Sequence, residues 1–132
     1  MKQILIVNAN YYDKISRNLV RSSKKILIQK KNRVNILDVT GIFEIPIAIK
    51  KNIKKFDAFV ALGCVIKGKT PHFDFICKST FDAILNLSIS YNKPIGNGII
   101  TAFNINQAKI RSDINQKNKG QEAALACIQL LK

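Results

Sequence analysis

The chain has 132 residues, of which 22 are Lys or Arg and 8 are Asp or Glu, so its formal net charge is +14 at pH 7. Hydrophobic residues make up 47% of it and aromatic residues 8%, which is typical of a folded protein and excludes a disordered one. The length predicts one domain, residues 1–132, and no apolar run approaches the roughly 20 residues that a membrane-spanning helix needs.

A strand and a helix are predicted first. Residues 4–7 are a continuous apolar run, which is typical of a strand buried on both faces of a sheet. Asp13 follows and is expected to cap a helix. The apolar residues of that helix recur at helical spacing: Ile15, Leu19, Val20, Ile26 and Leu27.

Two more units of strand and helix follow. Residues 34–39 predict a second strand, and Pro46 suits the first turn of a helix that reaches about Lys55. Residues 58–66 predict a third strand, and Pro71 opens a long helix. One side of this long helix is expected to carry Phe73, Ile76, Cys77, Thr80, Ile84 and Leu87.

The carboxyl-terminal part predicts one strand and further helix. Pro94 precedes a strand that runs through Ile99 and Ile100, and Asn118 is the expected cap of the last helix. Strands separated by helical crossovers imply a parallel sheet with helices on both faces. We therefore expect a doubly wound, flavodoxin-like α/β fold, a three-layer α/β/α sandwich around a four-stranded parallel sheet.

The cysteines and the charge restrict the class further. Cys64, Cys77 and Cys127 are odd in number and show no C-x-x-C spacing, so we expect buried free thiols in a reducing cytoplasm. The start of the chain has too short an apolar region for a secretory signal. The positive charge points to nucleic acid, an anionic membrane or a phosphorylated ligand, and a lysine-rich solvated surface explains it equally well.

The carboxyl ends of the strands are the expected place for a ligand, because ligands bind there in open parallel sheets. Three of these ends hold two adjacent tyrosines, a Phe-Glu pair and a Gly-Lys-Thr-Pro-His run with the only histidine, His72. The opposite edge is basic and chemically plain, with Lys30, Lys31, Arg33, Lys54, Lys55 and Lys93. This asymmetry favours a small-molecule site at the carboxyl edge.

One motif suggests an alternative function. Residues 63–70 match G-x-x-x-x-G-K-T, the phosphate loop of nucleotide hydrolases and kinases. The interior argues against such a loop, because Cys64-Val65-Ile66 prolongs an apolar strand and β-branched residues resist positive φ. Pro71 also removes an amide donor where the helix begins. A nucleotide-phosphate enzyme and a nucleic-acid-binding module driven by charge remain the alternative hypotheses.

Four segments carry more specific motifs: residues 41–46, residues 61–74, residues 96–101, and Arg111 with Asn118-Lys119-Gly120. The second contains G-x-V-I-[RK]-G-x-T-x-H-[FY]-D. In order and spacing these segments resemble lumazine synthase over nearly the whole chain. The resemblance implies a condensation without cofactor or metal, in which 5-amino-6-(D-ribitylamino)uracil and 3,4-dihydroxy-2-butanone 4-phosphate give 6,7-dimethyl-8-ribityllumazine, phosphate and water in riboflavin biosynthesis.

The resemblance also implies roles for single residues. His72 matches the proton-transfer histidine, Arg111 the phosphate-binding arginine and Lys119 a lysine that contacts the pyrimidine. Tyr11 is expected to stack on the uracil ring. Phe43-Glu44 are expected to hold the ribityl chain, and Gly68-Lys69-Thr70 to help hold phosphate. The full set of expected substrate contacts is Tyr11, Phe43, Glu44, Val65, Ile66, Gly68, Lys69, Thr70, Asn97, Arg111 and Lys119.

The chain departs from the family pattern at several positions. Ile42 stands where a small residue is usual, Thr40 where proline is common, and Asn97 where many members have phenylalanine. The resemblance further implies a homopentamer with active sites between subunits, small-molecule substrates, and neither a membrane nor nucleic acid as partner. The segment at residues 112–118 has no glycine, which favours a free pentamer over a larger shell.

Overall fold

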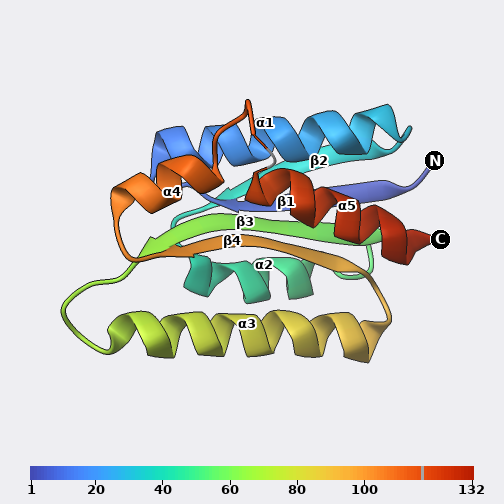
Figure 1. The fold of residues 1–132 in the computed structure, drawn as a ribbon. Coiled ribbons are helices and arrows are strands. Elements are labelled where there is room, and N and C mark those ends of the chain that lie inside the picture. Colours follow the sequence, from blue (N-terminus) through green and yellow to red (C-terminus); the bar gives the residue numbers. More distant parts are fainter. Residues whose placement is uncertain (117) are drawn as a thin grey trace.

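The computed structural model describes residues 1–116 and 118–132, and in these residues four parallel strands form a sheet in the order β2-β1-β3-β4. The strands are β1 (Gln3–Ala9), β2 (Arg33–Val39), β3 (Ala58–Ile66) and β4 (Ile95–Ala102). Helices α1 (Asp13–Gln29), α4 (Ile105–Arg111) and α5 (Lys119–Leu131) lie on one face. The short 3-10 helix η1 (Ile42–Glu44), α2 (Ile45–Lys51) and α3 (His72–Tyr91) lie on the other. The expected three-layer α/β/α fold is confirmed (Figure 1).

The apolar run in β1 explains the position of this strand inside the sheet. Ile4 and Ile6 pack into the cluster that α1 and α5 complete, whereas Leu5 and Val7 pack into the cluster under α2 and α3. Successive side chains point to opposite faces of a strand, so a strand covered on both faces must be apolar at every position. The prediction for residues 4–7 is therefore confirmed.

The outer strand β2 is less covered than expected. It pairs with β1 only, from Gln3↔Arg33 to Ala9↔Val39. Ile36 is 43% exposed and Leu37 is 36% exposed. The expectation that helices cover the sheet on both faces therefore holds for the central strands β1 and β3 and only partly for this edge.

Two helix boundaries differ from the prediction. The helix that begins near Pro46 ends at Lys51 rather than Lys55, because the Asn52 side chain donates to Ala48 O at 2.8 Å and closes the last turn. Asp13 is the first residue of α1 and Tyr12 is its cap. The Asp13 carboxylate instead pairs with Arg17 one turn later, at 2.6 Å.

Close approaches fix α5 against the sheet and α1. A Cβ atom at Gly96 would overlap the backbone carbonyl of Ala123, and one at Gly120 would overlap the carbonyl of Leu19. The hydroxyl of Ser23 also donates to Gly120 O at 2.6 Å. Asn118 caps α5 as expected, since its side-chain oxygen accepts from Gln121 N at 2.9 Å. These contacts determine where α5 begins, and with it the position of Lys119.

The cysteines are buried and free, as predicted. Burial raises the pKa of Cys64 to about 11 and the pKa of Cys127 to about 12.

At the amino edge of the sheet, Lys93 differs from the solvated surface that we expected, because it is half-buried and its ammonium donates to Ile53 O and Phe56 O. None of the described helices is both long and apolar enough to cross a membrane.

Candidate functional site

A cavity of about 400 Å³ lies at the carboxyl ends of β1 and β3. The end of each strand, the turn before η1 and the first turn of α3 supply its lining, which is Ala9, Tyr11, Tyr12, Gly41, Ile42, Phe43, Cys64, Val65, Ile66, His72, Phe73 and Ile76. Five predicted site residues are in this set: Tyr11, Phe43, Val65, Ile66 and His72. The structure therefore brings the histidine, two aromatic rings and two apolar strand residues into one space, which we call the histidine cavity.

The side chain of Ile42 is part of the histidine cavity. It is buried, and a Cβ atom at Gly63 would lie only 2.9 Å from its Cγ2 atom. Gly63 on β3 therefore leaves the space that this larger side chain occupies. The departure at residue 42 is thus accommodated by packing inside the core, between η1 and the sheet.

His72 is the first residue of α3, and its imidazole is exposed. Its backbone N–H donates to the hydroxyl of Thr70 at 3.4 Å, so the loop before α3 is tied to the first turn of the helix. Gly68, Lys69 and Thr70 are exposed on this loop. Among the residues that the structure describes, these three are outside the lining of the histidine cavity.

The phosphate-loop pattern at residues 63–70 is half strand. Residues 63–66 belong to β3 (Ala58–Ile66) and pair with β4 from Gly63↔Ile99 to Ile66↔Ala102. Backbone amides that are paired in a sheet cannot wrap around a phosphate. The prediction that Cys64-Val65-Ile66 prolongs the strand is confirmed, and the geometry disfavours the nucleotide-loop alternative.

A second cavity of about 400 Å³ lies along the edge strand β4, and we call it the arginine cavity. Its lining is Phe81, Asn97, Ile99, Ile100, Thr101, Arg111, Lys119 and Glu122, which includes three predicted site residues. Arg111 Nη1 donates to Thr101 O at 2.6 Å, and Lys119 Nζ is 4.0 Å from Glu122 Oε2. Both cations are therefore held beside β4, where an anion can reach them.

Asn97 contributes a polar group to the arginine cavity. Its side-chain oxygen accepts from Ile99 N at 3.1 Å, and the residue is exposed on β4. Where a phenylalanine would offer an apolar ring, this chain therefore presents an amide. The amide NH₂ group remains a donor toward the cavity.

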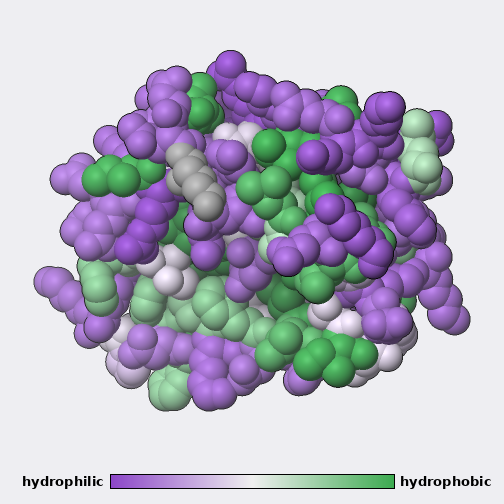
Figure 2. Space-filling model, turned by 45° about the vertical axis from the view of Figure 1, so that its right-hand side comes forward, coloured by the Kyte–Doolittle hydropathy of each residue, from purple (hydrophilic) through white to green (hydrophobic). Residues whose placement is uncertain are grey.

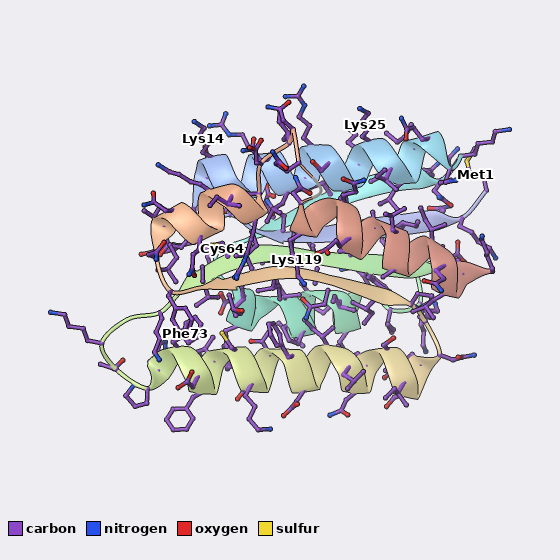
Figure 3. The ribbon with its side chains drawn as sticks, viewed as in Figure 1. Met1, Lys14, Lys25, Cys64, Phe73 and Lys119 are labelled. Atoms are coloured by element: carbon purple, nitrogen blue, oxygen red, sulfur yellow. The ribbon has the colours of Figure 1, made fainter. Side chains whose placement is uncertain are left out.

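The predicted site is thus divided between two places. Across the residues that the structure describes, the linings of the histidine and arginine cavities have no member in common. Cys64 and Phe73 of the histidine cavity lie toward the loops at the carboxyl ends of the strands, and Lys119 lies at the start of α5 (Figure 3). Tyr11 is 76% exposed and Phe43 is 61% exposed, so the aromatic side of the histidine cavity faces outward.

Glu44 lies on neither of these linings. Together with Phe43, Ser79 and Thr80 it lines a neighbouring cavity of about 410 Å³ between η1, α2 and α3. Phe43 borders both this space and the histidine cavity. The carboxylate of Glu44 accepts a hydrogen bond from the hydroxyl of Thr40 at 3.1 Å, which fixes one of its oxygens.

Several residues of the two linings were not among the predicted substrate contacts. Tyr12, Cys64, Phe73 and Ile76 belong to the histidine cavity, and Thr101 belongs to the arginine cavity. Their side chains are equally typical of a buried core. The sequence offered one signal for a site: Tyr12, Cys64 and Phe73 are adjacent to the predicted site residues Tyr11, Val65 and His72. Burial raises the pKa of Tyr12 and Cys64, so both contribute neutral groups at pH 7 and Cys64 is no thiolate nucleophile.

In the described part of the chain, no group of three or more His, Cys, Asp and Glu side chains is placed to hold a metal ion. The functional groups that line the two cavities include an imidazole, aromatic rings, a guanidinium, an ammonium, the Asn97 amide and the Glu122 carboxylate. This set suits proton transfer on a planar ligand and binding of an anion.

Comparison with known proteins gives a match over the whole chain. The sequence model of the family described as 6,7-dimethyl-8-ribityllumazine synthase matches residues 1–132. A protein of that name from Campylobacter jejuni is 38% identical, over 98% of this chain and 87% of the relative. Proteins of the same name from Methylorubrum populi and Afipia carboxidovorans are 38% and 39% identical over 98% of this chain, and 80% and 84% of their own lengths are covered.

Proposed function

Because this chain belongs to the 6,7-dimethyl-8-ribityllumazine synthase family, we propose that it condenses 5-amino-6-(D-ribitylamino)uracil with 3,4-dihydroxy-2-butanone 4-phosphate. The products are 6,7-dimethyl-8-ribityllumazine, phosphate and water, in the penultimate step of riboflavin biosynthesis. The observation that carries this proposal is the match over residues 1–132, which spans both cavities and His72. The family is one of transferase enzymes.

His72 is the proposed proton carrier. The amine of the pyrimidine attacks the ketone and, with loss of water, forms an imine; phosphate then leaves, and ring closure with loss of a second water gives the lumazine. Each step moves a proton on or off nitrogen, oxygen or carbon. An imidazole serves this task in both directions near neutral pH, and His72 is exposed and lines the histidine cavity.

The pyrimidine and its side chain are proposed to occupy the histidine cavity. Tyr11 and Phe43 offer aromatic surface to a planar ring, while Val65 and Ile66 supply the apolar floor. Glu44, fixed through one oxygen by Thr40, offers its other oxygen to a ribityl hydroxyl. Holding the two reactants together in this way supplies much of the acceleration, because little covalent chemistry is asked of the protein.

Arg111 is the proposed phosphate anchor, with the loop residues Gly68, Lys69 and Thr70. One guanidinium N–H is bound to Thr101 O, which orients the group and leaves further N–H donors for a phosphate. Lys119 and Asn97 line the same cavity and are proposed to contact the pyrimidine side of the complex.

The site is proposed to be completed by a second copy of the chain. The division of His72 and Arg111 between two cavities supports this, as does the outward-facing aromatic surface. Hydrophobic patches also interrupt the hydrophilic surface in Figure 2, and Leu85 and Ile89 of α3 are exposed. We propose a homopentamer with sites between subunits, in the cytoplasm, a location that the buried free thiols support.

The proposed reaction can be tested with purified protein and both substrates. The lumazine is followed by its absorption and fluorescence, and we expect it to form faster than in buffer alone. His72→Asn, which removes the proton carrier, is expected to lower kcat by about tenfold or more. A wild-type rate equal to that of buffer would overturn the proposed function.

A further inference from the structure

We propose that Thr40 is a positioning residue for Glu44, an inference that rests on the proposed function. Thr40 follows β2 directly, and Glu44 is the last residue of η1. The hydroxyl of Thr40 donates to Glu44 Oε1 at 3.1 Å. An ionised carboxylate can only accept hydrogen bonds, so the donor in this pair is the hydroxyl.

The same carboxylate oxygen lies close to the backbone of Gly41. A Cβ atom at Gly41 would lie 3.1 Å from Glu44 Oε1, closer than ordinary packing, so this oxygen lies against the backbone of Gly41. The main chain is tied as well, since Glu44 N donates to Gly41 O at 3.2 Å. The turn at residues 40–44 therefore fixes both the backbone and one carboxylate oxygen of Glu44.

This arrangement matters because Glu44 is half-buried beside Phe43, at the border of the histidine cavity. A free glutamate side chain populates several rotamers, and ordering it on binding costs affinity. Thr40 restricts the carboxylate before a ligand arrives and leaves Oε2 for a hydroxyl of the ribityl chain. A proline at residue 40 has no hydroxyl and could not donate to Glu44. This way of ordering the carboxylate therefore depends on the threonine of this chain.

The test compares variants of Thr40 in the lumazine-forming assay. Thr40→Val keeps the shape and removes the hydroxyl, and we expect it to raise KM for the ribitylaminouracil about three- to tenfold. KM for the butanone phosphate and kcat should change by less than about twofold, because the hydrogen bond acts on the pyrimidine side only. Thr40→Ser keeps the hydroxyl and should restore the KM of wild type.

A double-mutant cycle shows whether Thr40 acts through Glu44. Glu44→Ala removes the acceptor and should raise the same KM, and adding Thr40→Val to it should change nothing further. Thermal unfolding of each variant separates these effects from a loss of folded protein.

The outcomes distinguish this inference from the proposed function. An active wild type whose KM is insensitive to Thr40→Val overturns the inference and leaves the function standing. An equal effect of Thr40→Val in the wild type and in Glu44→Ala also overturns it, because Thr40 would then act independently of Glu44. A wild type without activity overturns both.

Discussion

The side-chain amide of Asn118 donates to the hydroxyl of Ser22, 96 residues earlier in the chain, at 2.7 Å. Asn118 is fully buried, and its side-chain oxygen accepts from Gln121 N at 2.9 Å. One side chain therefore caps α5 and ties this helix to α1. The next residue is Lys119, so the same contact fixes one cation of the arginine cavity.

Asn118→Ala is expected to destabilise the protein by about 2 kcal/mol, because a helix cap and a buried hydrogen bond are lost together. Urea unfolding measures the change in the free energy of unfolding. Ser22→Ala is the matched control, since it removes only the partner hydroxyl and should cost about half as much. An Asn118→Ala protein as stable as wild type would show that the cap contributes nothing.

Gly96→Ala is expected to disturb the contact between β4 and α5. The added methyl would overlap the carbonyl of Ala123, so the helix must move away from the sheet. We expect a loss of about 2 kcal/mol or more in the free energy of unfolding. Gly68→Ala, at a site with no atom within 4 Å of the added Cβ, should leave the stability within about 0.5 kcal/mol, and equal losses in both variants would contradict this explanation.

Arg111→Ala is expected to raise KM for the butanone phosphate about tenfold, because it removes a charged hydrogen bond to the phosphate. Arg111→Lys should recover little, since an ammonium cannot both donate to Thr101 O and bind phosphate through two parallel hydrogen bonds. Steady-state kinetics with each substrate varied in turn measure the effect. Arg21→Ala, an exposed residue of α1, is the control, and an unchanged KM in Arg111→Ala would remove this residue from the site.

The buried thiols predict a dependence of stability on pH in the alkaline range. Burial raises the pKa of Cys64 to about 11 and that of Cys127 to about 12, above the value of about 8.5 for a thiol in an unfolded chain. The folded state keeps these protons longer, so this stability is complete below about pH 8.5 and is lost as pH rises through the folded pKa values.

The double variant Cys64→Ala and Cys127→Ala checks this dependence. Between pH 8 and pH 10.5 the free energy of unfolding should fall less in the variant than in wild type. The difference should be about 2 kcal/mol for each thiol. Identical slopes would mean that the thiols ionise equally in the folded and unfolded states. As a second measure, the thiols of the folded wild type should react slowly with a disulfide reagent at pH 8, because the thiolate is the reactive form.

The central strands and the order of elements could be predicted from the sequence because periodicity and burial agree there. Residues 4–7 are apolar at each position since helices cover both faces of β1. The end of α2 could not be predicted, because the Asn52 side chain closes the helix where apolar spacing alone would continue it. The Asn118 cap of α5 could be predicted, whereas the overlap that makes Gly96 necessary depends on tertiary packing.

The candidate site could be predicted as a set of residues and not as an arrangement. Residue type and motif pointed to His72 and Arg111, but their separation depends on the place of β4 at the sheet edge. The hydrogen bond between Thr40 and Glu44 could not be predicted either. The sequence shows that Thr40 departs from the family pattern, but the contact of its hydroxyl with Glu44 depends on the folded turn.

Subunit complementation tests most directly whether lumazine forms in a site shared by two copies of the chain. His72→Asn and Arg111→Ala proteins are unfolded together in equal amounts and refolded as a mixture, with wild type treated alike as the reference for yield. The butanone phosphate is kept well below its wild-type KM, where the tenfold higher KM of Arg111→Ala leaves about a tenth of the wild-type rate. In random hybrid rings about a quarter of the sites combine an intact His72 with an intact Arg111 from the neighbour. We predict that the mixture regains about a quarter of the wild-type rate. A mixture no more active than the two variants refolded separately would contradict the shared site.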